Sequence, residues 1–197
     1  MGIDILPLPD SKPPTFRTYL VDLSDHRSFY TTVTATPSVV RRWISQTIHY
    51  HRRHLSRLVV GLGVQWNPSS VGSAAATLQL CVGCRCLIFQ LHQANYVPQS
   101  LRRFLEHPRN TFVGVWNHMD AGMLLESRHK LRVGRIVDLR HVAGARMGMS
   151  RKVSMERLTE VVLGLSGVEK DGKIGRSNWE KYWLSHEQVK YAGADAA

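Results

Sequence analysis

The segment from Leu58 to Pro68, LVVGLGVQWNP, constrains the fold more than any other stretch of the chain. Successive side chains of a strand point to opposite faces of its sheet, so the bulky apolar residues here share one face. The opposite face carries only Val59, Gly61, Gly63 and Gln65. Glycines weaken a strand and have no side chain to pack. Two on one face therefore predict that another part of the chain approaches that face closely.

The rest of the chain alternates between strand and helix periodicity. Besides the segment above, strands are predicted at 16–24, 28–36, 74–82, 85–91, 111–116 and 135–140. Helices are predicted at 37–57, 97–108, 119–131, 154–165 and 184–197, with Thr36, Ser154 and Ser185 as N-caps. Three consecutive strands followed by alternating helices and strands indicate an α/β fold with a mixed central sheet flanked by helices.

The length and composition are those of one domain. The 197 residues are 43% hydrophobic, which suffices for a proper core. We expect a mobile, Pro-rich leader at 1–15 and a single domain at 16–197. No apolar run approaches the roughly 18 residues of a membrane-spanning helix, and the N-terminus does not resemble a secretory signal. We therefore expect a soluble intracellular protein with no membrane partner, in the cytoplasm and with the nucleus as a second compartment.

The charge balance favours a polyanionic partner. Twenty-six Lys and Arg against 15 Asp and Glu give a formal net charge of +11 and a pI near 10.1. Nucleic acid is the usual partner of such a protein, and a generally basic soluble surface is the alternative. The basic end of the first predicted helix offers Arg52 and Arg53 as candidate substrate-binding residues, although such clusters are more often solvated faces.

The three cysteines, Cys81, Cys84 and Cys86, lie together in CVGCRC. Their odd number and the lack of a secretory signal argue against a disulfide framework. A zinc site is the weaker alternative, because no second Cys or His pair follows at a finger-like distance. We expect them to be small residues of a hairpin that turns at Val82–Cys84.

Carboxylates gathered from separate elements are what a two-metal phosphodiesterase needs, because Mg²⁺ takes hard oxygen ligands. Asp120 follows the predicted strand at 111–116, and Tyr191 and Asp195 are four residues apart on one face of the last predicted helix. Both elements are candidates to cover the bare face of the first-described strand. Spacing alone leaves open that Asp120 is an ordinary helix-start acid and Tyr191 a core-edge aromatic.

A longer series of motifs resembles a known family. The order VVGxxxxW, LQLCV, FVGVxxxxD and SNWxKxxLSxEQxxYAxxDA is similar to the exonuclease domain of Werner-syndrome-type proteins, from about Leu58 to the C-terminus. These proteins belong to the DEDD group of 3′–5′ exonucleases, which have the ribonuclease-H-like, or DnaQ-like, fold. The last motif is the most specific part of the resemblance, with Trp179, Gln188, Tyr191 and Asp195 at the family's positions.

The resemblance implies roles for individual residues. Asp120 and Asp195 correspond to metal-binding carboxylates of the second and third motifs, and Tyr191 to the tyrosine that orients the attacking water. The implied cofactor is Mg²⁺ or Mn²⁺, and the implied product is a nucleoside 5′-monophosphate. The family's first motif is Asp-x-Glu, but Gly63 and Gln65 stand at those positions. Gln65 offers only a neutral amide oxygen, so we expect it, with Gly63, to contact the metal or the terminal nucleotide.

A narrower resemblance suggests how the site is completed. TPSVVRRWI, LVVGLGVQW and AATLQLCVGxRCLI are similar to segments of the plant atypical DEDD exonucleases, which include the RISC-interacting clearing 3′–5′ exoribonucleases. That group forms hexameric rings with active sites between subunits. It implies a metal-dependent 3′–5′ exoribonuclease that acts on short single-stranded RNA, forms a homohexamer and works beside Argonaute in the RISC. The alternative function is a catalytically inactive RNA-binding or Argonaute-partner module.

Overall fold

The computed structural model describes residues 4–8, 15–23, 28–53, 57–69, 74–165 and 171–197. Within them, a mixed sheet of eight strands runs in the order β1-β2-β3-β6-β5-β4-β7-β8. The strands are β1 (Asp4–Pro7), β2 (Arg17–Asp22), β3 (Ser28–Thr34), β4 (Val59–Trp66), β5 (Ala75–Val82), β6 (Arg85–Phe89), β7 (Thr111–Gly114) and β8 (Arg135–Asp138). The pairs β3–β6, β4–β7 and β7–β8 are parallel, and the others are antiparallel.

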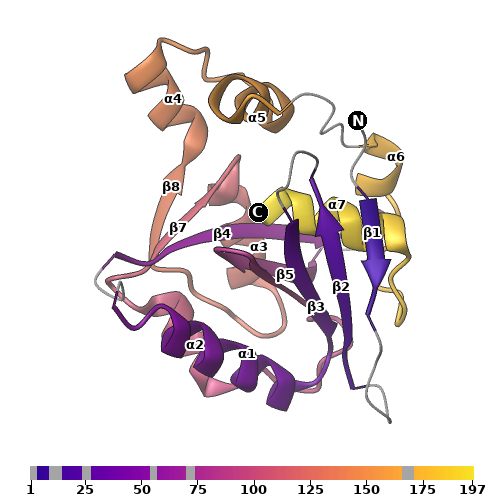
Figure 1. Cartoon of the computed structure of the whole chain (residues 1–197). Coiled ribbons are helices and arrows are strands. Elements are labelled where there is room, and N and C mark those ends of the chain that lie inside the picture. Colours follow the sequence, from indigo (N-terminus) through magenta and orange to yellow (C-terminus); the bar gives the residue numbers. More distant parts are fainter. Residues whose placement is uncertain (1–3, 9–14, 24–27, 54–56, 70–73, 166–170) are drawn as a thin grey trace.

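Helices cover both faces of this sheet. They are α1 (Pro37–Tyr50), α2 (Gln99–Glu106), α3 (Asn117–Glu126), α4 (Leu139–Met147), α5 (Met155–Leu163), α6 (Gly172–Gly175) and α7 (His186–Ala196). α1 and α2 lie on one side of the sheet, α7 lies on the other, and α4 and α5 lie beyond the end at which β8 finishes (Figure 1). This arrangement confirms the predicted α/β class. No helix among the described residues is long and apolar enough to cross a membrane.

The strand β4 separates two cores. Its apolar side chains, such as Val60 and Leu62, pack with α1 and α2 in the first core. The second core lies on the opposite face, where Val189 and Ala192 of α7 are fully buried. The bare face of β4 is therefore covered by the last helix, as its glycines predict.

Gly61 marks the closest approach of α7 to the sheet. A Cβ atom at this position would overlap the carbonyl oxygen of Ala196, which is backbone and cannot rotate away. The requirement for glycine is thus a requirement for backbone-to-backbone packing between β4 and the last turn of α7.

The start of α7 is fixed by a capping box. The Ser185 side chain accepts a hydrogen bond from the Gln188 backbone N–H, and the Gln188 side chain accepts one from the Ser185 N–H. Two donors that the helix leaves unpaired are thereby satisfied. Gln188 also donates to Ser177 and to the Asn178 carbonyl, which ties α7 to the segment before it.

The predicted strands and helices are confirmed, with differences at several boundaries: α1, for example, ends at Tyr50 rather than at 57, and the short α6 was not predicted. α3 begins at Asn117 rather than at 119. The strand predicted at 135–140 ends at Asp138, because the Asp138 side chain accepts the Arg140 backbone N–H and so caps α4, a helix that the sequence pattern did not predict. The expected leader at 1–15 contains β1, which pairs with β2 at the edge of the sheet. The division into a leader and a single domain otherwise stays a prediction.

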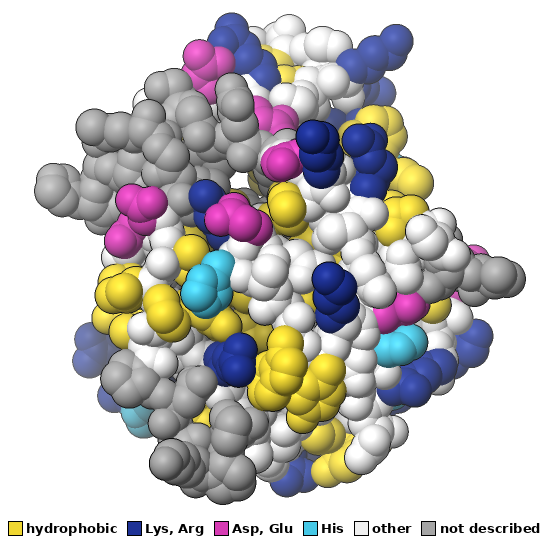
Figure 2. Space-filling model, turned by 90° about the vertical axis from the view of Figure 1, so that its right-hand side faces the viewer, with side chains coloured by type: hydrophobic (Ala, Val, Ile, Leu, Met, Phe, Trp, Pro, Cys, Tyr) yellow, Lys and Arg dark blue, Asp and Glu magenta, His cyan; other side chains and the backbone are white. Residues whose placement is uncertain are grey.

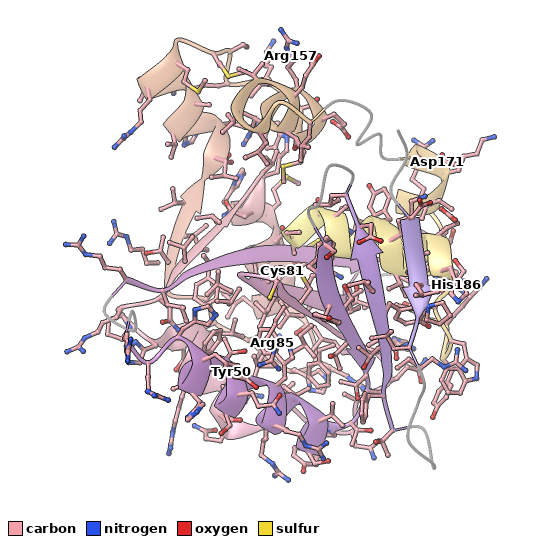
Figure 3. The ribbon with its side chains drawn as sticks, in the orientation of Figure 1. Tyr50, Cys81, Arg85, Arg157, Asp171 and His186 are labelled. Carbon is pink, nitrogen blue, oxygen red and sulfur yellow. A yellow bond between two sulfur atoms is a disulfide. The ribbon has the colours of Figure 1, made fainter. Side chains whose placement is uncertain are left out.

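Cys81 and Cys86 form a disulfide across the β5–β6 hairpin (Figure 3), so the expectation against disulfides was wrong for this pair. The hairpin turns through Gly83, whose φ of 59° suits a two-residue turn, and Cys84, which is an exposed free thiol. This turn places Cys81 directly opposite Cys86, with the two Cα atoms 4.1 Å apart. The two sulfur atoms meet because the register of the β5–β6 hairpin places Cys81 opposite Cys86.

A buried ion pair fixes the junction between β8 and α4. Asp138 is 8% exposed and Arg140 is 3% exposed, and the guanidinium donates to both carboxylate oxygens. Burial alone would raise the pKa of Asp138. The hydrogen bonds and charge of Arg140, with a hydrogen bond from the Trp116 backbone N–H, outweigh burial and hold the pKa below its ordinary value.

Substituting Gly61 tests the packing of α7 on β4. Gly61→Ala should lower the free energy of unfolding by at least about 1–3 kcal/mol, because the added methyl group must push α7 away. Gly122→Ala is the matched control. Nothing lies within 4 Å of a Cβ at Gly122 in α3, so alanine there should raise stability by roughly 0.5–1 kcal/mol. Urea denaturation measures both, and equal effects would contradict the close approach.

Substituting Asp138 tests the ion pair through its pH dependence. A carboxylate with a lowered pKa stabilises the fold above its unfolded pKa of about 4, and this contribution is lost as the pH falls through the folded pKa. Asp138→Asn should therefore lower the free energy of unfolding by roughly 2 kcal/mol at pH 7 and by much less at pH 3. Asp171→Asn, at the exposed cap of α6, should show little pH dependence. A loss for Asp138→Asn that is the same at both pH values would argue against the pair.

Candidate functional site

The centre of the candidate site is a contact between β4 and the last turn of α7. The Gln65 side-chain amide donates from Nε2 to Asp195 Oδ2 at 2.9 Å. Gln65 is buried, and Asp195 is half-buried. A Cβ atom at Gly63 would lie 3.2 Å from the same Asp195 oxygen. The structure therefore brings three of the predicted site residues together.

A second buried amide borders the space above Gly63. Gln79 on β5 lies opposite Gly63, and Thr77 lies opposite Gln65. Gln79 donates from Nε2 to Thr77 Oγ1 at 2.6 Å, while its Oε1 is buried without a hydrogen-bond partner among the described residues. This Oε1 lies 2.9 Å from the position that a Gly63 Cβ would take. Asp195 Oδ2 and Gln79 Oε1 thus face one small space, and because both accept hydrogen bonds, a donor or a cation fits between them.

Tyr191 lies one helical turn before Asp195, as the spacing predicts. Its ring is 6.0 Å from the Trp179 ring, centroid to centroid, and Trp179 is almost fully buried. A Cβ atom at Gly175 in α6 would lie 2.6 Å from the Tyr191 hydroxyl oxygen. The hydroxyl group therefore packs closely against the α6 backbone.

Asp120 lies in the first turn of α3 and is half-buried. α3 follows β7, the strand that pairs with β4, and α3 itself contacts β4. Its Leu124 belongs to the core on the α1 side of the sheet, opposite to the core of α7. The convergence of Asp120 and Asp195 on one site stays a prediction.

Arg52 and Arg53 lie away from this contact. They follow the end of α1, where the neighbouring His51 ring is 3.5 Å from a Cβ atom built at Gly83 in the β5–β6 turn. This turn adjoins the beginning of β4, about six residues or 20 Å from Gln65. On the side of the molecule that carries β1 and α6, Lys and Arg side chains are spread among other types (Figure 2). On this face the basic side chains do not gather in one patch, and binding by Arg52 and Arg53 stays a prediction.

A cavity of about 400 Å³ opens beside Asp195. It lies between α4, α5 and the end of α7, and its lining is mainly apolar, with Leu139, Val142 and Leu158 among the contributing residues. Arg146 is the basic residue of this lining. The candidate site therefore combines a carboxylate with an adjoining, mainly apolar hollow.

The residues of one chain do not fit a pair of divalent metal ions. Among the described residues, no group of three or more His, Cys, Asp or Glu is arranged to hold a metal. Beside Gly63, Asp195 Oδ2 is a charged oxygen and Gln79 Oε1 a neutral one, whereas a pair of divalent cations needs several hard, anionic oxygen ligands. The Gln65 N–H further occupies one oxygen of Asp195. The arrangement suits a carboxylate satisfied by an amide.

Sequence reasoning did not find two features of this region. Gln79 faces Gly63 only because of the β4–β5 register, which alternation within one strand does not reveal. Trp116, immediately before α3, has a φ of 61° in the left-handed region and stacks on Arg140. The sequence feature that could have drawn attention to Trp116 is an aromatic residue placed between a buried strand and the helix of Asp120.

Comparison with protein families and curated proteins agrees with the motifs. The model of a family described as 3′–5′ exonuclease matches residues 64–197. Over 142 residues the chain is 30% identical to a 3′–5′ exonuclease of Arabidopsis thaliana, covering 70% of this chain and 48% of that protein. It is 31% identical over 142 residues to the mouse (Mus musculus) bifunctional 3′–5′ exonuclease/ATP-dependent helicase WRN, covering 70% of this chain and 10% of that protein. The chain thus spans less than half the length of these two relatives.

Solved structures show the same fold. Escherichia coli RNase D, described as an exoribonuclease involved in structured RNA processing, superposes with a TM-score of 0.68 at 15% identity, over 83% of this chain and 40% of that chain. Brucella melitensis NrnC bound to pGG gives a TM-score of 0.59 at 14% identity, over 72% and 68% of the two chains. The EXD2 exonuclease domain soaked in Mn and Mg gives 0.53 at 23% identity, over 83% and 82%.

The family match covers more than half of the chain, and it includes α3 and α7, the helices of Asp120, Tyr191 and Asp195. The fold is that of the ribonuclease-H-like exonucleases above. On these grounds the chain belongs to the 3′–5′ exonuclease family.

Proposed function

We propose that this protein is a 3′–5′ exoribonuclease that shortens single-stranded RNA from its 3′ end and requires Mg²⁺ or Mn²⁺. The observation that carries the proposal is the contact of Asp195 with Gly63 and Gln65. At this contact Asp195, which stands at the third-motif position, meets β4, the strand that carries the first-motif positions Gly63 and Gln65. Family membership supports the reaction, and a net charge of +11 supports a nucleic acid substrate.

The class of substrate rests on relatives of the same fold. RNase D is described as an exoribonuclease, and NrnC was solved with the dinucleotide pGG. We therefore favour RNA over DNA and short strands over long duplexes. Membership of the plant subgroup, a role beside Argonaute in clearing small RNA fragments, and a cytoplasmic or nuclear location belong to the same proposal.

A second copy of the chain completes the site in this proposal. Gly63 and Gln65 leave one chain two carboxylates short, and the remaining groups do not suit two divalent cations. Acidic side chains of a neighbouring copy, in a homohexameric ring, would supply the missing charge beside Asp120 and Asp195. Activity should then require the assembled ring, and the isolated protomer should be inactive.

A binding module without catalysis is the second candidate. The hydrogen bond from Gln65 to Asp195 favours it, because an amide donor stabilises the carboxylate where the family uses metal. Such a protein would still hold a single-stranded 3′ end in the cavity beside Asp195. The two candidates differ in a single measurable property, which is loss of nucleotides from bound RNA.

An end-labelled RNA assay separates them. The protein is incubated with short RNA labelled at the 3′ or the 5′ end, in Mg²⁺, Mn²⁺ or EDTA. The mass of the protein assembly is measured in the same buffers to establish its oligomeric state. Stepwise loss from the 3′ end should be abolished by EDTA and fall at least about 100-fold in Asp195→Ala, since removal of one stabilising group at a reacting centre has effects of this size. Glu187→Ala, on an exposed part of α7, is the control.

The assay has clear opposing outcomes. RNA that is bound at its 3′ end but never shortened would establish the binding module and overturn the nuclease. Activity that persists in EDTA and in Asp195→Ala would overturn the site. Full activity in a monomer would overturn the shared site while leaving the reaction intact.

Restoring the two family acids tests the fit of metal directly. In Gly63→Asp, Gln65→Glu, three carboxylates would crowd the space near Asp195, so the melting temperature in EDTA should fall through charge repulsion. Mn²⁺ should raise it again by several degrees, because the cation binds the folded state alone. The original chain should show a much smaller shift as a monomer. Equal shifts for both proteins would show that one chain already holds the metal.

A further inference from the structure

Trp116 presents a flat aromatic surface next to the candidate site. It lies between β7 and α3 and is 50% exposed, although it is among the largest side chains of the protein. Its backbone adopts a φ of 61° and a ψ of 20°, a left-handed conformation that is strained for a bulky residue. Such strain persists only where the surroundings hold it, so the position of this ring is imposed.

The contacts around Trp116 fix the plane of its ring. The Arg140 Cζ atom lies 3.3 Å from the ring centroid, which places the guanidinium over one face of the ring. The Trp116 backbone N–H donates to Asp138. The following residue, fully buried Asn117, donates to the carbonyls of Phe112 and Val137. One face of the ring is therefore anchored, and the exposed half of the side chain lies on the solvent side.

Arg140 is not available to bind phosphate. Its side chain is buried, its Nε and Nη2 groups donate to Asp138, and its Nη1 group donates to the Arg151 carbonyl. With its donors engaged, the guanidinium serves as the support on which the Trp116 ring rests. An exposed aromatic ring held by a buried cation is a preformed stacking surface.

Trp116 lies close in sequence to residues that line the cavity beside Asp195. Val113 pairs with Gly61 in the parallel β4–β7 ladder. A Cβ atom at Gly114 would lie 2.7 Å from the Leu62 carbonyl oxygen. Val113 and Gly114 line the cavity beside Asp195, and so does Leu139, the residue before the Arg140 on which the Trp116 ring stacks. Trp116 follows Gly114 by two residues, so its ring lies near this cavity, on the side of β8 and α4.

We propose that the exposed face of Trp116 stacks on a nucleobase of the single strand whose 3′ end lies at Asp195. This inference rests on the proposed function, since it requires a single-stranded nucleic acid as ligand. A preformed aromatic face suits any base, so the platform positions the strand without selecting a sequence. Because stacking is not ionic, it complements the charge attraction that a +11 chain exerts on phosphates.

Trp183 provides a matched control. It is 49% exposed, and its ring lies 3.9 Å from the Arg17 Cζ atom, so its exposure and cation contact resemble those of Trp116. It lies in the segment before α7, on the lining of a separate cavity that also includes Arg17 and Thr34. If the loss of any exposed tryptophan that stacks on a cation weakened RNA binding, both Trp116→Ala and Trp183→Ala would bind more weakly. Loss of base stacking at the site would weaken binding in Trp116→Ala alone.

The test measures binding in EDTA, so that cleavage plays no part. Seven-nucleotide RNAs carry 2-aminopurine, or an abasic nucleotide, at each of the last three positions in turn. Wild type should quench 2-aminopurine at one position, and removal of the base there should weaken binding about 10- to 100-fold. Trp116→Ala should bind intact RNA more weakly by the same factor. Replacing the base by an abasic nucleotide should not lower the affinity of this variant further. Trp116→Phe should keep most of the affinity, and Trp183→Ala should match wild type.

Further readouts separate stacking from other roles of Trp116. The slope of log affinity against log salt should be unchanged in Trp116→Ala, because no phosphate contact is lost. Circular dichroism and a melting curve establish that each variant folds. If wild type binds RNA and Trp116→Ala binds equally well, the stacking proposal is overturned and the proposed function stands. If wild type binds no RNA, both fail. If Trp116→Ala changes the oligomer mass without changing base dependence, the surface is a subunit contact instead.

Discussion

The packing of α7 on the glycine face of β4 is the contact on which the rest of the site depends. The last turn of α7 lies so close to Gly61 that no side chain fits between the two backbones. This approach carries Asp195 to Gly63 and Gln65, and it buries the side-chain amides of Gln65 on β4 and Gln79 on β5. On the other face of the sheet, the apolar side chains of β4 hold α1 and α2 in a separate core. One strand thus builds a core and a site with alternate residues.

The chemistry at this contact differs from that of a carboxylate cluster. Where the family resemblance implies two acids, the chain has a glycine and an amide that donates to Asp195. A carboxylate hydrogen-bonded by an amide is stable without a cation, whereas three carboxylates in the same space would repel one another. The protomer is therefore able to fold around its site before any metal or second copy arrives. Assembly, in the proposed function, would then convert a stable resting arrangement into a reactive one.

Local signals predicted much of this fold, and pairing between distant segments accounts for what they missed. The capping residues Ser154 and Ser185 correctly marked helix starts, and alternation located β4. α4 was not predicted, because its cap Asp138 ends a strand and its Arg140 is buried by an ion pair that periodicity does not reveal. Alternation singled out Gly63 and Gln65, helix spacing offered Asp195, and the motif resemblance gave these residues their roles. Gln79 and the Cys81–Cys86 disulfide depend on strand register, which a single sequence leaves unspecified.

The capping box of α7 and the backbone contact at Gly61 together constrain the length of the helix. Ser185 fixes where α7 begins, and Asp195 comes ten positions later, just before the residue that touches Gly61. Each helical residue advances the chain by about 1.5 Å and turns it by about 100°. One inserted or deleted residue between these two anchors would turn the carboxylate by that angle, away from Gln65. Residues on the solvent side of α7 can be replaced by other types. The number of residues between Ser185 and the contact with Gly61, however, is set by the site.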